Sequence, residues 1–200
     1  MKLECLKFKS AGLFSVKLEG CPSMMLDDVS VYRLGLSQGM EVDEVLFRKI
    51  CALSGQEGAK RAAARLLTAG RKTESELRQK LRQKGFEQED IDFAAQTFKE
   101  NGFLDDSEYA ESYIKDALRL KKYSVRMIRQ KLTLKGIDRE VVAELTAHLD
   151  DSQQLYAILE SELRKSPDEK DIERLKRRLC AKGFGLWDIN RILGELEYET

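Results

Sequence analysis

The chain has 200 residues, of which 42% are hydrophobic and 35% are charged, and it contains only two prolines. This composition suffices for a folded core, favours helices and argues against a largely disordered protein. The 35 basic and 35 acidic residues cancel, which excludes a strongly cationic protein that binds nucleic acid by overall charge. Charges interrupt the N-terminal apolar residues and no long apolar run follows, so we expect a cytoplasmic protein without a membrane segment.

The first 58 residues differ from the rest of the chain. Short runs of apolar residues interrupted by single polar ones at 3–8 and 13–18, around Ser10–Gly12, predict a β-hairpin. Helical patterns follow, a short one from Ser30 to Leu34 and a longer one from Asp43 through Ile50 toward the first repeat. We therefore treat 1–58 as a separate N-terminal segment.

One sequence pattern then occurs three times. It starts with a residue type that caps helices, continues with an apolar i, i+4 pair, and ends in lysine–glycine followed by an apolar residue. The copies run from Thr73 to Phe86, from Ser124 to Ile137 and from Asp171 to Phe184. A polar side chain at the first position can cap the helix, and the glycine can end it in the left-handed conformation. Each copy predicts a capped helix with one core-facing apolar stripe.

An apolar helical stretch precedes each copy and another follows it, so each repeat is expected to contain three short helices. The predicted fold class is mainly α: three tandem three-helix repeats that form an elongated array, after a small N-terminal segment with a β-hairpin and one or two helices. The repeats are expected at 59–104, 105–149 and 150–200. A loop is expected at 165–170 in the third repeat.

Sequence motifs for catalysis and metal binding are missing. The chain contains no phosphate-binding P-loop, no GxGxxG and no GxSxG, and its single histidine, His148, has no neighbouring residues at ligand spacing. The four cysteines form no CxxC pair, and we expect them to be small buried hydrophobic residues. Asp105–Asp106 is interpreted as a helix N-cap, and Trp187 as a partly buried packing residue. We expect no enzyme, no cofactor and no metal site.

Basic residues recur on the predicted helices at positions that suit contacts with a partner. A helical projection places Arg78 and Arg82 on one exposed flank, with Arg126 and Arg129 on the corresponding flank of the next repeat. Arginine binds phosphate and carboxylate groups through two parallel hydrogen bonds. A solvated helix face with local salt bridges is the alternative. The candidate partner-binding residues are Arg71, Arg78, Arg82, Lys122, Tyr123, Arg126, Arg129 and Lys176.

Two stretches carry a resemblance to a known family. The residues 101–110, NGFLDDSEYA, resemble the glycine–hydrophobic–Leu–Asp–Asp signature of the bacterial RecX family, regulators of the RecA recombinase. The residues 126–137 resemble the family pattern RxIxxxLxxKGI that follows it. Together with the three lysine–glycine turns, the resemblance covers roughly 59–197.

The resemblance implies a non-catalytic regulator in DNA recombination, DNA repair and the SOS response. Such a protein binds RecA, or the groove of the RecA–single-stranded-DNA filament, and restrains its recombinase and co-protease activities. We expect a monomer that contacts DNA directly only weakly. An autonomous DNA-binding helical module stays open as the alternative, because three-helix units with a basic helix are typical of helix-turn-helix proteins.

Overall fold

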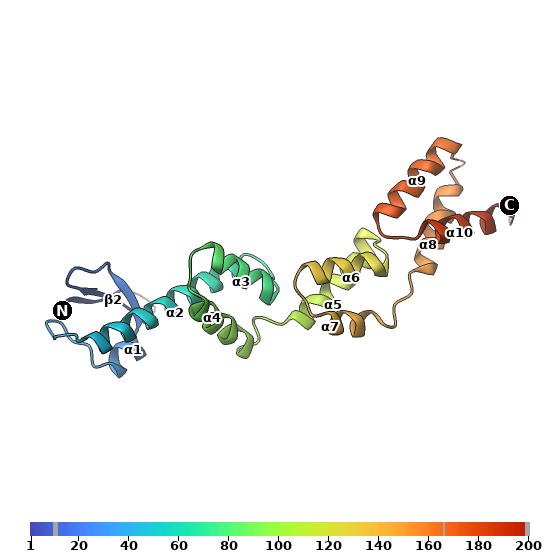
Figure 1. Ribbon diagram of the computed structural model, residues 1–200. Coiled ribbons are helices and arrows are strands. Elements are labelled where there is room, and N and C mark those ends of the chain that lie inside the picture. The colour runs from blue at the N-terminus through green and yellow to red at the C-terminus, as the bar shows by residue number, and fades with distance from the viewer. Residues whose placement is uncertain (10–11, 166, 199–200) are drawn as a thin grey trace. The chain divides into compact units, whose positions relative to one another are not determined.

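The computed structural model describes residues 1–9, 12–165 and 167–198. The chain divides into two compact units, Met1–Asp105 and Asp106–Thr200. The first unit holds a small sheet and the first repeat, and the second holds the other two repeats (Figure 1). The predicted class, mainly helical repeats after a small segment with a β-hairpin, is confirmed.

The N-terminal sheet has one strand more than the sequence predicted. Strands β1 (Leu3–Phe8) and β2 (Leu13–Leu18) form the predicted antiparallel hairpin, and β3 (Met24–Asp27) pairs with β2 on its other side. β3 is only four residues long and shows no clear alternation of apolar and polar residues, so the sequence pattern did not reveal it. The Met25 amide at this edge donates to Ser54 Oγ (3.2 Å), which ties β3 to the following long helix.

Helices α1 (Asp28–Arg33) and α2 (Glu44–Thr68) match the two predicted helices. The Asp43 carboxylate caps α2 by accepting a hydrogen bond from the Leu46 amide (2.7 Å). Helix α2 continues without a break past residue 58, so the N-terminal segment and the first repeat share one helix. Its first half packs on the sheet and its second half supplies Ala59 and Ala63 to the core of the first repeat.

The first repeat is completed by α3 (Glu74–Gln83) and α4 (Gln88–Glu100). Thr73 and Glu76 form the predicted capping box at the start of α3. Gly85 has a φ of +84°, the left-handed conformation expected where this helix ends. The apolar side chains of α3 and α4 that face the core are fully buried, namely Leu77, Leu81, Ile91 and Ala94.

The second repeat contains α5 (Asp106–Asp116), α6 (Val125–Leu134) and α7 (Arg139–Thr146). Ser124 caps α6 as predicted, since its Oγ accepts from the Met127 amide (3.2 Å). A π-helical turn, η1 (Ala117–Lys121), continues α5 and ends in Lys122, whose φ is +52°. Among the described residues, Lys122 alone combines a side chain with a positive φ. Neither glycine nor asparagine marks this turn, so it could not be predicted from the sequence.

The third repeat corrects one predicted helix start. It consists of α8 (Ser152–Leu163), α9 (Glu169–Ala181) and α10 (Leu186–Tyr198), which surround one core (Figure 1). The predicted cap Asp171 lies inside α9; Asp168 is the cap, because its carboxylate accepts from the Asp171 amide (2.7 Å). The predicted loop at 165–170 is therefore shorter than expected, and Ser166 lies outside the described residues.

The burial of the cysteines differs from the prediction, and the hydropathy of the helices bears on membrane spanning. The expectation of buried cysteines was wrong: Cys51 is exposed, and Cys5, Cys21 and Cys180 are only partly buried. Cys51 lies on the side of α2 beside β3, where its Sγ is 3.9 Å from Met24 Sδ. In the described part of the chain, no helix is both long enough and apolar enough to cross a bilayer.

Candidate docking surface

The predicted arginines of the first repeat are engaged within that repeat. Arg78 on α3 donates to Glu74 through Nε (2.8 Å) and to Asp92 on α4 through Nη1. Burial alone would raise the pKa of Glu74, but hydrogen bonds from Arg78 and Lys99 hold it below its ordinary value. Arg78 therefore connects α3 to α4 and is half-buried rather than presented on an open flank.

Of the remaining candidates in the first and third repeats, Arg71 and Arg82 are exposed and Lys176 is half-buried. Arg82 is exposed and donates to Gln88 Oε1 (3.1 Å), which leaves its charge without a carboxylate in that contact. Arg71 is exposed between α2 and α3. In the third repeat, Lys176 pairs with Glu173 (3.1 Å), the acidic neighbour seen in the sequence. Local ion pairs thus partly neutralise the predicted basic flank. This agrees with the alternative interpretation of these residues as a solvated helix face with local salt bridges.

In the second repeat, both predicted arginines bind main-chain or hydroxyl oxygens. Arg129 donates from Nε to Thr146 Oγ1 (2.6 Å) and from Nη2 to the Thr146 carbonyl (3.1 Å). This carbonyl is at the C-terminal end of α7, where a cation is electrostatically favourable. Arg126 donates from Nε to the Gly183 carbonyl (3.1 Å) in the third repeat. Both side chains remain exposed at their outer ends.

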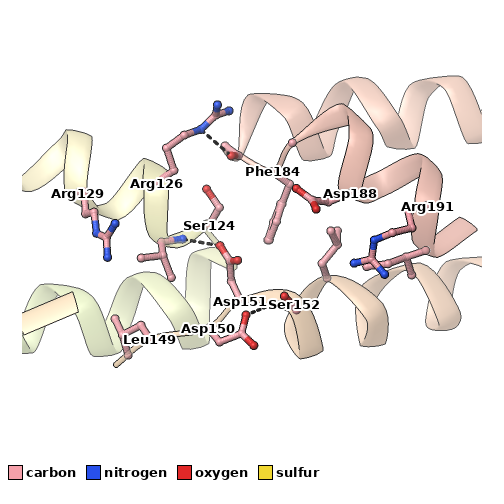
Figure 2. Close-up of a pocket in the computed structure, with 15 residues that line it drawn as sticks. Ser124, Arg126, Arg129, Leu149, Asp150, Asp151, Ser152, Phe184, Asp188 and Arg191 are labelled. Carbon is pink, nitrogen blue, oxygen red and sulfur yellow. Dashed lines mark hydrogen bonds between the residues drawn. The ribbon is translucent and has the colours of Figure 1, made fainter. Parts of the chain in front are cut away.

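The contact of Arg126 belongs to a junction between the second and third repeats that the sequence did not reveal (Figure 2). The Ser124 amide donates to the Lys182 carbonyl (3.0 Å), and the Val125 amide donates to Asp151 Oδ2 (2.6 Å). Both amides belong to the first turn of α6 and have no partner within the helix. The third repeat therefore satisfies the exposed donors of a helix in the second, and the two repeats are held together there.

A cavity of about 350 Å³ opens at this junction. Figure 2 shows Arg126 and Arg129 reaching it from α6, and Arg191 from α10. Two of its three carboxylates accept hydrogen bonds from backbone amides: Asp150 from Ser152 (2.9 Å) and Asp151 from Val125. The full lining comprises Ser124, Val125, Arg126, Arg129, Leu149, Asp150, Asp151, Ser152, Leu155, Gly183, Phe184, Gly185, Asp188, Arg191 and Ile192.

The aromatic candidates and the neighbouring turn also have defined positions. Lys122 is exposed in its left-handed conformation and directs the chain into the cap of α6. Tyr123 is half-buried, and Lys131 Nζ lies 5.3 Å from the centre of its ring. Trp187 corrects the expectation of a packing residue, because 73% of it is exposed, with the Arg191 guanidinium 5.5 Å from its ring centre.

The structure thus brings four of the eight candidates together in the second repeat: Lys122, Tyr123, Arg126 and Arg129. The other four lie in the first and third repeats. Within the described residues, no group of three or more His, Cys, Asp and Glu side chains could hold a metal ion. The arrangement offers exposed cationic side chains beside a half-buried tyrosine, and such cations suit binding to an acidic macromolecule.

Comparison with known proteins identifies these repeats. Residues 59–95 match the family model described as "RecX, first three-helix domain", and residues 105–145 match "RecX, second three-helix domain". Two solved structures share the fold, both at 21% identity. A regulatory protein RecX has a TM-score of 0.70 over 96% of this chain and 98% of its own. RecX from Lactobacillus salivarius has a TM-score of 0.59 over 72% and 97%.

Curated relatives extend the match beyond the fold. "Regulatory protein RecX" of Caldanaerobacter subterraneus subsp. tengcongensis is 25% identical over 94% of this chain and 95% of its own length. The protein of the same name from Clostridium botulinum strain Eklund 17B is 31% identical over 79% of each chain, and that of Clostridium perfringens strain 13 is 30% identical over 83% and 81%. With this identity over most of both lengths, and with two repeats that match the family's own domains, the chain belongs to the RecX family of regulatory proteins.

Proposed function

We propose that this protein binds RecA or the RecA–single-stranded-DNA filament and restrains its recombinase and co-protease activities, without catalysing a reaction itself. Membership of the RecX family is the observation that carries the proposal. The described residues support it with side chains of the required chemistry, since basic candidate residues occur in each three-helix repeat. We also propose that the repeats at 59–104, 105–149 and 150–200 act as separate contact modules.

Contacts by several modules of one chain support this mode of action. Each exposed basic residue contributes little by itself, because its charge is screened by solvent and salt. When one module has bound, the others are held close to the same filament and bind at a high effective concentration. Modest surfaces on successive repeats can therefore give strong total binding to a polymeric target.

Arg126 and Arg129 have a double role in this proposal. Arg126 uses Nε for the Gly183 carbonyl, and its outer nitrogens extend past that contact. Arg129 is likewise fixed by Thr146. A guanidinium that is already oriented loses less conformational freedom when it binds a carboxylate or phosphate. We expect these two residues to contribute more to partner binding than Arg78, whose charge is already paired.

The proposal is tested by adding the purified protein to RecA on single-stranded DNA and measuring ATP hydrolysis, strand exchange and co-sedimentation. We expect saturating protein to lower both activities. Arg126→Glu/Arg129→Glu should weaken co-sedimentation, whereas Arg78→Glu serves as the matched control on the first repeat. Unchanged RecA activities at saturation would refute the function. Tight binding to DNA in the absence of RecA, with a steep salt dependence, would instead favour the autonomous DNA-binding module.

A further inference from the structure

A cavity of about 270 Å³ lies in the first unit, between helices α1, α2 and α4. Val29 and Arg33 line it from α1, Leu53 and Lys60 from α2, and Phe93 from α4. We call it the N-terminal cavity. No residue that the sequence singled out for partner binding belongs to its lining, so the proposed contacts of the repeats do not explain it.

The exposed lining of the N-terminal cavity is mainly apolar. Val29 is 58% exposed and Phe93 is 41% exposed. Leu53 is partly buried and packs against the core of the N-terminal segment. Single exposed apolar residues are common on protein surfaces, but three from different helices around one cavity indicate a surface for binding. Pockets for small molecules usually hold about 300–1,000 Å³, so this cavity suits one inserted side chain better than a free ligand.

Three of the four charged residues that line the cavity have close partners within the first unit. Asp27 accepts a hydrogen bond from the Ser30 amide (2.7 Å). Lys60 forms an ion pair with Glu57 (2.9 Å), and its Nζ lies 5.9 Å from the centre of the Phe93 ring. Asp27, Glu57 and Lys60 are therefore each engaged by a near neighbour.

Arg33, the last residue of α1, is the charged lining residue that differs. It is exposed, and in the part of the chain that the structure describes its guanidinium forms no hydrogen bond and no ion pair. Burial would raise the pKa of Asp27, but hydrogen bonds from Ser30 and the charges of the two basic lining residues hold it below its ordinary value. Asp27 therefore stays ionised at neutral pH, and the acidic and basic lining residues balance. A partner must then be recognised at short range, through hydrogen bonds to the guanidinium.

We propose that the N-terminal cavity is a docking site for a protein segment that inserts one apolar side chain and binds Arg33 through a carboxylate. The inserted side chain removes the exposed surface of Val29, Leu53 and Phe93 from water, which stabilises the complex. The carboxylate accepts two parallel hydrogen bonds from the guanidinium, which sets the orientation of the segment. An arginine without an ion pair among the described residues, beside an apolar lining, complements a segment of this kind.

The charges favour a protein segment over a nucleic acid. A phosphate backbone is bound by several basic residues whose charge is not neutralised. Here Asp27 and Glu57 balance the two basic lining residues and would repel phosphate groups. The cavity joins the N-terminal segment to the first repeat, so it adds a contact outside the basic flanks of the proposed function. This inference rests on that function only for the identity of the natural partner, RecA.

The chemistry of the cavity is tested by NMR on the full chain with two probes, indole-3-propionate and indole-3-propylamine. Both carry the same ring, but one ends in a carboxylate and the other in an ammonium group. We expect the carboxylate probe to bind in the millimolar range and to shift the methyl resonances of Val29 and Leu53. The ammonium probe should bind about threefold more weakly or worse. Arg33→Ala should weaken binding of the carboxylate probe by about fivefold, whereas Arg48→Ala, at an exposed arginine outside the cavity, should not.

Co-sedimentation with RecA filaments tests the natural partner. Val29→Glu/Arg33→Glu places a negative charge in the cavity and reverses the charge of Arg33, so we expect it to weaken binding by about tenfold. The matched control is Val45→Glu/Arg48→Glu on α2. It changes a valine of similar exposure, 64% against 58%, and an arginine, neither of which lines the cavity. The control should change binding by less than about twofold.

Thermal unfolding of each variant, followed by circular dichroism, verifies that it is folded. The proposal is overturned if the carboxylate probe leaves the Val29 and Leu53 resonances unchanged, or if both probes bind equally well. Equal RecA binding by the two double variants would also overturn it. If wild-type protein does not bind RecA filaments while the probe results hold, the proposed function fails and this inference stands.

Discussion

Gly183 meets two structural requirements, a left-handed backbone and close contact with the second repeat, and replacing it with alanine tests both. Its φ of +98° lies in the region that disfavours side chains. In addition, a Cβ built at Gly183 would lie 2.6 Å from Met127 Cβ and closer still to Ser124 Oγ, both in the second repeat. Gly85 ends the corresponding helix of the first repeat with a φ of +84°, but a Cβ there would meet nothing within 4 Å.

The two variants therefore differ by the cost of the contact between repeats. Forcing an L-residue into the left-handed region costs about 1–2 kcal/mol, and this cost applies to both Gly85→Ala and Gly183→Ala. The clash adds ~1–3 kcal/mol at Gly183, the usual range for overpacking a tightly fitted site. We expect Gly183→Ala to lower the free energy of unfolding by roughly 2–5 kcal/mol, and Gly85→Ala by no more than about 2 kcal/mol.

Hydrogen exchange measured by mass spectrometry shows where in the chain each variant loses stability, and how large the loss is. In Gly183→Ala, the amides of Ser124 and Val125 should lose protection, because their acceptors are Lys182 and Asp151 of the third repeat. In Gly85→Ala the loss should stay in the first repeat. Equal destabilisation by both variants, or unchanged exchange at Ser124 and Val125, would refute the proposed packing between the repeats.

Three further predictions concern single side chains. Asp168→Ala should cost about 1 kcal/mol in urea unfolding, whereas Asp171→Ala should cost less than about 0.5 kcal/mol, because Asp168 caps α9. Acid should destabilise the first unit as the pH falls below 4.5, the ordinary pKa of Glu74, because this pKa is lowered in the folded protein; urea unfolding at several pH values should show a smaller loss for Glu74→Gln. The fluorescence of Trp187, the single tryptophan, should be quenched by acrylamide in the native protein nearly as strongly as in urea.

Elements with strong local signals were predictable from the sequence. The capping box at Thr73 and the lysine–glycine turns each follow from a few adjacent residues, so a local pattern was sufficient. The start of α9 was misplaced for the same reason: two aspartates three residues apart are both good caps, and alignment with the other repeats favoured Asp171 over Asp168. The π-helical turn before Lys122 had no local signal, because its left-handed end is a lysine rather than a glycine or an asparagine.

The candidate site was less predictable, because a helical projection gives the direction of a side chain but not its partner. The projection placed Arg78 and Arg129 at corresponding positions, yet Asp92 pairs with one and Thr146 binds the other. Each partner lies on a helix other than that of its arginine. Asp92 follows Arg78 by 14 residues, and Thr146 follows Arg129 by 17 residues. The prediction for Trp187 was wrong because large aromatic residues are usually packed against other side chains. In the structure this tryptophan is exposed.

The surroundings of Lys131 and Lys135 could not be predicted for the same reason: these lysines lie over the rings of Tyr123 and Tyr109. Lys131 and Lys135 were recognised as recurring residues, but their counterparts in the first repeat, Lys80 and Lys84, look identical in the sequence. What distinguishes them is the set of tyrosines on α5 and before α6, which no alignment of the capped helix includes. Modules that share the same capped helix can therefore surround corresponding lysines with different side chains. Those side chains come from other helices, so the pattern of the capped helix alone does not predict them.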